Sequence, residues 1–333
     1  MKKRIVVHIG THKTGTTSIQ RALYEQRADL SAAGILYPRT DRDRGDRLSL
    51  RKHGELSAVA RRGRPQAVER ERTALIEEFE ASGATTMIVS EEGLSGPNPN
   101  CAEFFKPLAE TYALEVVCYL RRQDIFVESF FNQVVKRAER ELSQDIIEYT
   151  NSERTRSRLD YHGILCWWRD LPAKVTALDF AAEVKRGSLM DSFTRAANIE
   201  SVRLVDTQAN TSPDMRVILA MMAMNKAGLD YNEKAVLRAG QRLAEKSALK
   251  PLKLLLGQRA RAALLADCAD SNARLAADFG VQFDSRLPEE DEAPVLGPDL
   301  DYLLNLLGSA TLGGKQGADG QAGGADDGFR KRA

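Results

Sequence analysis

The stretch IVVHIGTHKTGTTSIQRAL, residues 5–23, decides the fold of this chain. Its first five residues are rich in β-branched apolar side chains, which predicts a short, buried parallel strand. Gly10 and Gly15 bound the loop that follows, and a helical pattern with one apolar face begins near Thr16. A strand, a glycine loop and a helix start together present backbone N–H groups and the positive end of a helix dipole. The segment is therefore a predicted phosphate-binding loop.

The position of the lysine distinguishes this loop from a Walker A loop, in which the lysine directly follows the second glycine. Here Gly15 is followed by two threonines, and Lys13 lies inside the loop. A cation at this position is expected to act nearer the bond being broken than the flank of a triphosphate. The pattern K-[ST]-G-T-T after a first strand resembles the 5′-phosphosulfate loop of sulfotransferases that use PAPS, 3′-phosphoadenosine 5′-phosphosulfate. The alternative is a glycine turn that carries a surface lysine.

A second segment, EVVCYLRRQDIFVESFFNQVV at 115–135, supports the same resemblance. An apolar strand runs into Arg121, and Ser129 lies eight positions later. Sulfotransferases of this family carry an arginine and a serine at this spacing, so the resemblance implies that these two residues hold the 3′-phosphate of PAPS. The guanidinium fork of arginine matches the geometry of phosphate. Arg122 has two interpretations, a solvated or substrate-facing charge or a direct cofactor contact.

The resemblance also implies roles within the loop. Lys13 would stabilise the charge that builds on the departing phosphate oxygen. His12 is expected to shape the cradle, whereas His8 is expected within the strand. The other predicted cofactor-binding residues, which offer backbone amides and hydroxyls, are Gly10, Thr14, Gly15, Thr16, Thr17 and Ser18.

Sulfuryl transfer to a hydroxyl or an amine also requires a general base. The predicted strand 85–90 is followed by Glu91 and Glu92, and this S-E-E stretch resembles the S-S-E often found beside the loop in the family. Glu92 aligns best with the family glutamate and Glu91 is second. The alternative is an acidic pair that only complements a helix dipole. His53, in K-H-G-E-L, is a third candidate base, or else an incidental loop histidine.

Composition narrows the functional class. The chain has 333 residues, 43% of them hydrophobic and 29% charged, which is enough for a full α/β core. Its 48 basic and 47 acidic residues give no reason to expect nucleic-acid binding. The four cysteines are scattered, without metal-ligand spacing, so we expect reduced thiols and no metal. Without a signal peptide or a membrane-spanning apolar run, the protein is expected in the cytoplasm.

The order of elements predicts an α/β fold, with a P-loop-type parallel sheet flanked by helices. Strands are expected at 5–9, 85–90, 115–120 and 174–180, and a short strand or turn, ended by Pro38, at 34–40. A first helix is expected directly after the glycine loop. Further helices are expected at 65–82, 125–142, 159–171, 185–198 and 215–228. The predicted domains are a sulfotransferase-like domain at 1–284, a linker with a short docking helix at 285–307 and a disordered Gly/Ala-rich tail at 308–333.

The acceptor is less well defined by the sequence. The basic stretch 39–72 is either solvated surface or the lining of a cleft for an anionic acceptor. The family's glycine-rich R-K-G loop, typical of enzymes that act on small molecules, is missing, which favours a glycan or glycolipid hydroxyl. The chain also resembles sulfotransferases of the carbohydrate type at Tyr161, Leu165, Trp168, Ser271, Asn272, Leu275 and Ala276.

Two other classes of protein remain as alternatives. A nucleotide kinase or NTPase would need a lysine after Gly15 and an acidic residue at a second strand end to hold Mg²⁺. A catalytically silent protein that binds PAPS or a nucleotide would keep the loop without the reaction.

Overall fold

The structure is a computed structural model that describes residues 2–39, 52–136, 145–205, 213–229, 231–246, 250, 252–287, 302, 303, 305, 306 and 308. The chain divides into two compact units. The first comprises Met1–Phe130, Glu148–Asn210 and Gln258–Leu287, and the second comprises Phe131–Ile147, Thr211–Gly257 and Pro288–Ala333. This division is discontinuous along the chain, and the domain boundaries expected from the sequence remain a prediction.

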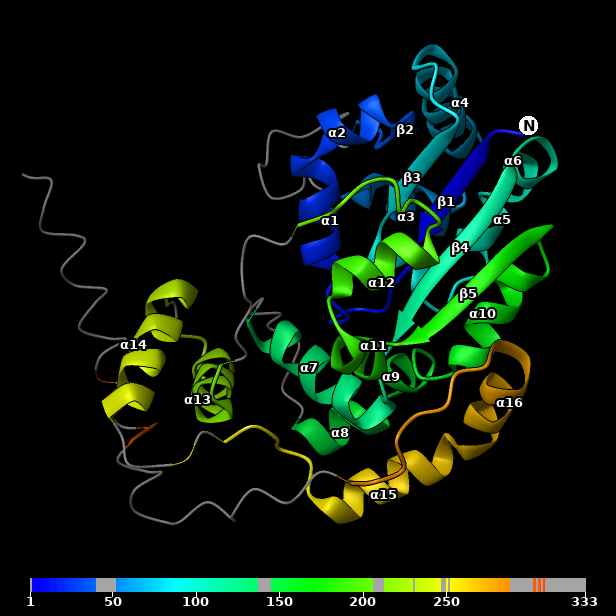
Figure 1. Cartoon of the computed structure of the whole chain (residues 1–333). Helices are drawn as coiled ribbons and strands as arrows, with labels where there is room; N and C mark the ends of the chain where they lie inside the picture. The colour runs from blue at the N-terminus through cyan, green and yellow to red at the C-terminus, as the bar shows by residue number, and fades with distance from the viewer. Residues whose placement is uncertain are drawn as a thin grey trace, which may run out of the picture. The chain divides into compact units, whose positions relative to one another are not determined.

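The first unit contains a five-stranded parallel sheet in the order β2-β3-β1-β4-β5 (Figure 1). The strands are β1 (Arg4–His8), β2 (Ile35–Leu36), β3 (Thr86–Ser90), β4 (Ala113–Leu120) and β5 (Ala173–Asp179). Val7 of β1 is in register with Val89 on one side and Val116 on the other. The predicted α/β fold with a parallel sheet is therefore confirmed, and β1, which leads into the glycine loop, is its central strand.

Helices cover both faces of this sheet. Val6, Ile88 and Val117 point to one face, and Val7, Val89 and Val116 point to the other, because successive side chains of a strand alternate. The first face packs against α1 (Thr16–Glu25), α2 (Arg27–Ala32) and α12 (Leu189–Ala196). The second packs against α3 (Gly54–Arg62), α4 (Pro65–Ala81), α5 (Asn100–Glu103), α6 (Lys106–Thr111), α10 (Tyr161–Arg169) and α16 (Ala269–Phe279).

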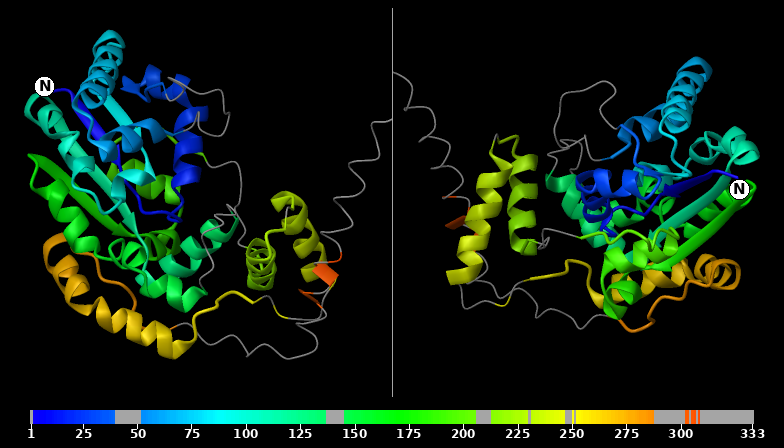
Figure 2. Two further views of the ribbon diagram at one scale, coloured as in Figure 1. Left: turned by 180° about the vertical axis from the view of Figure 1, so that it is seen from behind. Right: turned by 45° about the horizontal axis from the view of Figure 1, so that its top comes forward.

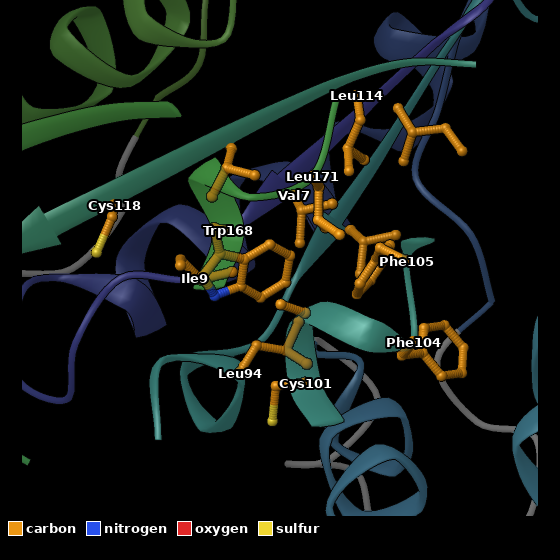
Figure 3. Packing of buried hydrophobic residues seen from close by; sticks show 14 of the residues in the cluster. Val7, Ile9, Leu94, Cys101, Phe104, Phe105, Leu114, Cys118, Trp168 and Leu171 are labelled. Atoms are coloured by element: carbon orange, nitrogen blue, oxygen red, sulfur yellow. The ribbon is translucent and has the colours of Figure 1, made fainter. Parts of the chain in front are cut away.

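The core of the second face centres on Trp168, which is 1% exposed. Its ring centroid lies 5.5 Å from that of Phe105, and Figure 3 shows both beside Val7 and Ile9 of the central strand region. The expectation of a helix over 159–171 that carries Trp168 is thus met by α10. Aromatic burial at this position holds α5, α6 and α10 against the strand that presents the loop.

The short strand or turn expected over 34–40 contains the two-residue strand β2. Two other predicted elements differ from those found. In place of the helix expected over 185–198 there are two helices, α11 (Phe180–Arg186) and α12. The side chain of Asp179 caps the start of α11 by accepting from Ala181 N at 3.0 Å. The side chain of Ser188 caps the start of α12 by accepting from Met190 N at 3.1 Å. The helix expected over 125–142 is α7 (Gln123–Lys136), and positions 137–142 lie outside the described residues.

A buried ionic cluster joins α15 (Gln258–Asp267) to α7. Arg261, which is 2% exposed, donates to Asp124 at 3.0 Å and also to Glu128. Gln123 exchanges side-chain hydrogen bonds with Asn272 of α16. Figures 1 and 2 show α16 beside α10 at the β5 edge of the sheet. Asn272 and Leu275 therefore have structural roles in attaching α16.

The rest of the first unit includes α8 (Ile146–Asn151), which begins at its boundary, α9 (Glu153–Arg156) and the 3₁₀ helix η2 (Glu92–Ser95). The second unit contains α13 (Met215–Lys226), the expected apolar helix, and α14 (Glu233–Lys246). These two helices cross closely, since a Cβ added at Gly240 would lie 2.3 Å from Val217 Cγ2. Tyr302, on the predicted docking helix, donates its hydroxyl to the carbonyl of Gly240 at 3.0 Å.

Within the described ranges, no helix is both long and apolar enough to span a membrane. The predicted disordered tail lies outside the described residues except at position 308, as does most of the predicted linker.

Candidate functional site

The glycine loop leaves the carboxyl end of β1 and is tied to β4. Ile9 N donates to Val117 O at 2.9 Å, and Thr11 N donates to Tyr119 O at 3.0 Å. The hydroxyl of Thr14 donates to Thr11 O at 2.6 Å and closes the loop on itself. The predicted loop residues thus form one compact turn at the centre of the sheet edge, where the carboxyl ends of parallel strands commonly bind ligands.

Two residues of the loop adopt left-handed backbone conformations, Lys13 at φ 69° and Gly15 at φ 74°. Such alternation of backbone conformation turns successive N–H groups toward one side and makes an anion-binding concavity. The side chain of Lys13 is exposed. A left-handed lysine is uncommon outside functional loops, since its Cβ makes this conformation unfavourable.

The loop closes tightly around Gly10. A Cβ added there would lie 2.8 Å from His8 Nε2 and 3.1 Å from Thr14 Oγ1, so only glycine fits. His8 is fully buried in β1, as expected, and its Nδ1 pairs with Ser90 Oγ at 2.8 Å. Its Nε2 has no hydrogen-bond partner among the described residues. Burial lowers the pKa of His8 to about 4 against the opposing charge of Glu92, so the imidazole beneath the loop is neutral at pH 7.

The start of the helix that follows the loop is suited to binding an anion. α1 begins after Gly15 with no side chain capping its first turn and no acidic residue in that turn. The first N–H groups of a helix have no acceptor within the helix, and an anion satisfies them. Thr16 and Ser18 are buried there and Thr17 is exposed. The loop and the helix start therefore fit a phosphate group on the evidence of their own geometry.

Arg121 lies at the end of β4, beside the loop. Its guanidinium carbon lies 4.7 Å from the ring centroid of Phe180, and a Cβ at Gly15 would lie 3.2 Å from the same ring. Phe180 therefore connects Arg121 to the loop. Burial lowers the pKa of Arg121, yet an arginine remains protonated in a protein. Sequence reasoning missed Phe180, because a phenylalanine after a strand carries no signal of its own.

Ser129 is half-buried in α7. The next residue, Phe130, packs its ring 5.0 Å from that of His12, so α7 contacts the loop. The structure brings Arg121, Ser129 and the loop to the same edge of the sheet, and their joint contact with a 3′-phosphate stays a prediction.

Arg122 has a different role from either interpretation made from the sequence. Its guanidinium donates to both carboxylate oxygens of Asp124, at 2.7 and 3.0 Å. It also donates to the carbonyls of Asp284 and Arg286, each at 2.6 Å. With its side chain 12% exposed, Arg122 is a structural tie that holds the segment after α16 against the start of α7.

The acidic pair lies where β3 ends. Glu91 is buried and caps η2, where its Oε1 accepts from Gly93 N at 3.0 Å and from Ser57 Oγ at 3.2 Å. Glu92 accepts from Gln20 Nε2 at 3.0 Å through Oε2 and from Lys52 Nζ at 3.0 Å through Oε1. Because Gln20 belongs to α1, Glu92 is bonded directly to the helix that the loop begins.

The two carboxyl groups have opposite electrostatic environments. Burial, together with the charge of Glu92, raises the pKa of Glu91 to about 7. Burial alone would also raise the pKa of Glu92, but the charges of Lys52 and His12 and the hydrogen bond from Gln20 outweigh it and hold that pKa well below its usual range. Glu92 is thus the ionised member at neutral pH. The dipole-complementing alternative describes Glu91 well, since this residue caps a helix.

His53 is held by backbone groups. Ser90 N donates to its Nδ1 at 3.0 Å, which leaves the proton on Nε2, 3.3 Å from Pro38 O. The ring is 4% exposed and meets Tyr37 edge-on. Both ring nitrogens are therefore engaged in holding the backbone, and His53 is the weakest of the three candidate bases.

Lys52 and Gln20 complete this site, although neither was singled out from the sequence. Lys52 belongs to the K-H-G-E-L stretch and to the basic run 39–72, which is the one signal that could have indicated it. Of that run, Arg42, Arg44, Arg47 and Arg51 lie outside the described residues, so a basic acceptor cleft remains a prediction. In the part of the chain that is described, no group of three or more His, Cys, Asp or Glu side chains could hold a metal ion.

Comparison with known proteins gave few similarities. No protein-family model matches the chain. No curated protein matches it. Among solved structures, the chain is similar to a sulfotransferase from Alicyclobacillus acidocaldarius, with 17% sequence identity, a TM-score of 0.38, and coverage of 69% of this chain and 94% of that one.

Proposed function

We propose that this protein is a sulfotransferase that moves the sulfuryl group of PAPS to a hydroxyl, or an amine, of an acceptor. One observation carries the proposal. The glycine loop presents an exposed, left-handed Lys13, and the helix it begins is bonded through Gln20 to the ionised Glu92. An anion cradle, a cation and a carboxylate at one edge of a sheet supply the three functions that sulfuryl transfer needs.

For donor binding, the loop amides and the hydroxyls of Thr16, Thr17 and Ser18 would hold the 5′-phosphate. Arg121 and Ser129 would hold the 3′-phosphate, so they would distinguish PAPS from a nucleotide that lacks this group. The uncapped start of α1 supports the first assignment, and the proximity of Phe180 to both Arg121 and Gly15 supports the second.

In the transfer itself, PAPS supplies a sulfur that the acceptor oxygen attacks as the sulfur–oxygen bond to the phosphate breaks. Lys13 would stabilise the negative charge on the departing phosphate oxygen. Glu92 would accept the proton of the acceptor hydroxyl, because it is ionised and 13% exposed, whereas Glu91 is buried. A glycan or glycolipid hydroxyl is the acceptor we propose, on the resemblance described above.

Isothermal titration calorimetry with PAP, the desulfated product of PAPS, tests the donor assignment. We expect micromolar binding of PAP and negligible binding of ATP with Mg²⁺. In Arg121→Ala, PAP affinity should fall at least tenfold, as expected for a charge-assisted phosphate contact worth about 1.5–3 kcal/mol. Arg70→Ala, at an exposed position of α4, serves as the matched control and should bind PAP like the unchanged protein.

Tight binding of ATP with Mg²⁺ and none of PAP would overturn the proposal in favour of a kinase or NTPase. Binding of PAP without transfer to any acceptor in a radiolabelled-sulfate screen would instead support a silent binding protein.

A further inference from the structure

Among the described residues, the ammonium of Lys52 contacts both Glu91 and Glu92. Lys52 Nζ lies 3.0 Å from Glu92 Oε1 and 3.6 Å from Glu91 Oε2. Lys52 directly precedes the segment that leads into α3, whereas the two carboxyl groups lie where β3 ends, so the three side chains meet only in the folded protein. One ammonium can balance one carboxylate. A second ionised carboxylate so close to the first would be strongly unfavourable.

The hydrogen-bond partners of the pair are unequal. Each oxygen of Glu92 accepts from a side-chain donor, Lys52 on one side and Gln20 on the other. Glu91 receives both of its hydrogen bonds on Oε1. Its Oε2 is buried without a hydrogen-bond partner among the described residues. An ionised Glu91 would leave a charged, buried oxygen without a donor, which costs more than a protonated one.

Other titratable groups also act on the pair. His12 of the loop helps to keep Glu92 ionised. His8 lies beneath the loop, with its pKa lowered by burial, and is neutral at pH 7. His53 has both ring nitrogens engaged by backbone groups. Tyr37 and Cys101 are kept neutral because burial raises their pKa values, and Arg61 of α3 acts on Cys101. Among the described residues, Lys52 is thus the cation that contacts both carboxyl groups.

From this geometry we propose that Lys52 is a positioning residue, which holds Glu92 ionised and directs the one proton of the pair to Glu91. In mildly acidic solution the pair would then contain a base and a neutral acid, although both residues are glutamates. The use of Glu92 as the base rests on the proposed function, whereas the distribution of the proton between the two glutamates does not.

Carbon-13 NMR titration of the glutamate side-chain carboxyl carbons tests this distribution in the full chain. Glu91→Gln and Glu92→Gln identify the two signals. We expect the Glu92 signal to stay that of a carboxylate to well below the usual glutamate range. In Lys52→Met, the pKa of Glu92 should rise by about 1 unit or more, since an opposite charge at this distance lowers a carboxyl pKa by about 1–3 units.

Lys52→Arg keeps the cation and should restore most of the lowered pKa. Lys106→Met is the matched control, because Lys106 pairs with Glu103 on the surface of α6, and it should leave both signals unchanged. If the pKa of Glu92 stays the same in Lys52→Met, the proposal is wrong. Circular dichroism verifies that Lys52→Met is folded. We expect it to fold because the side chain of Lys52 is partly exposed.

Kinetics separate this proposal from the proposed function. In the sulfotransferase reaction, the acidic limb of the pH–kcat profile should move to higher pH in Lys52→Met by the same amount as the NMR pKa of Glu92, with PAP affinity unchanged. A failure of PAP to bind would overturn the proposed function and leave the NMR result to decide the role of Lys52. A changed NMR pKa with an unmoved pH profile would overturn Glu92 as the base.

Discussion

At the scale of single residues, the candidate site depends on where each charge is held. Lys13 occupies a left-handed position of the loop, and Lys52 is bonded to Glu92. Arg121 stacks on Phe180, whereas its neighbour Arg122 is committed to Asp124 and to backbone carbonyls. Arg121 and Arg122 are adjacent in the sequence, yet they have different roles, because the fold gives each of them different partners.

Lys13→Ala tests the proposed stabilisation of the leaving group. Turnover should fall by about 10²–10³-fold, as expected when one donor to a developing negative charge is removed. The thermal midpoint should change little, because the side chain is exposed. Turnover is measured by the formation of PAP and the midpoint by differential scanning fluorimetry, with exposed Lys174→Ala in β5 as the control. Unchanged turnover would contradict the role given to Lys13.

At the scale of elements, the site is assembled by attachments between segments far apart in the chain. Gln20 of α1 reaches Glu92 across 72 positions, and Lys52 reaches it across 40. On the other side of the loop, Arg261 of α15 holds the first turns of α7, the helix that contains Ser129. The position of Ser129 therefore depends on an ionic cluster that takes no part in the chemistry.

Arg261→Met should destabilise the protein by about 3–5 kcal/mol, because it removes the guanidinium that pairs with two buried carboxylates, and loss of one partner of a buried ion pair is strongly destabilising. Asp124 and Glu128 are 0% and 3% exposed, so water cannot replace the lost guanidinium. The free energy of unfolding is measured by urea titration. Arg259→Met, on the exposed side of the same helix, is expected to change it by less than about 0.5 kcal/mol. A similar small change in Arg261→Met would show that the cluster is not stabilising.

At the scale of the whole molecule, the buried Glu91 connects stability to pH. Its pKa in the folded chain is raised to about 7 from an ordinary value of 4.5. The folded state therefore binds this proton more tightly than the unfolded state does, and its contribution favours folding below pH 4.5. That contribution is lost as the pH rises toward 7, by roughly 1.4 kcal/mol for each unit between the two pKa values.

Glu91→Gln should remove this dependence, since the amide keeps the shape of a protonated carboxyl group and does not ionise. Urea unfolding at several pH values between 5 and 8 compares the two proteins. We expect the variant to gain stability relative to the unchanged protein as the pH rises through this range. A constant difference across the range would mean that Glu91 is ionised in the folded protein throughout, contrary to the burial of its carboxyl group.

The sequence by itself determined the type of sheet, the strand that carries the loop and the residues of the loop. A run of β-branched residues, the spacing of two glycines and a helical pattern act over a few neighbouring residues, and β1, β3, β4 and α4 were predicted correctly for that reason. It also indicated Glu91 and Glu92 as candidate bases, and their use in catalysis remains a prediction.

Only the tertiary structure decided which of these residues share a charge, a proton or a backbone contact. Lys52 with Glu92, His53 with the backbone of Ser90, and Arg122 with Asp284, 162 positions away, are pairings between distant segments. Ionisation and hydrogen bonding depend on burial and on distances of a few ångströms. Neither quantity is present in a linear pattern, so the roles within the acidic pair follow from the fold.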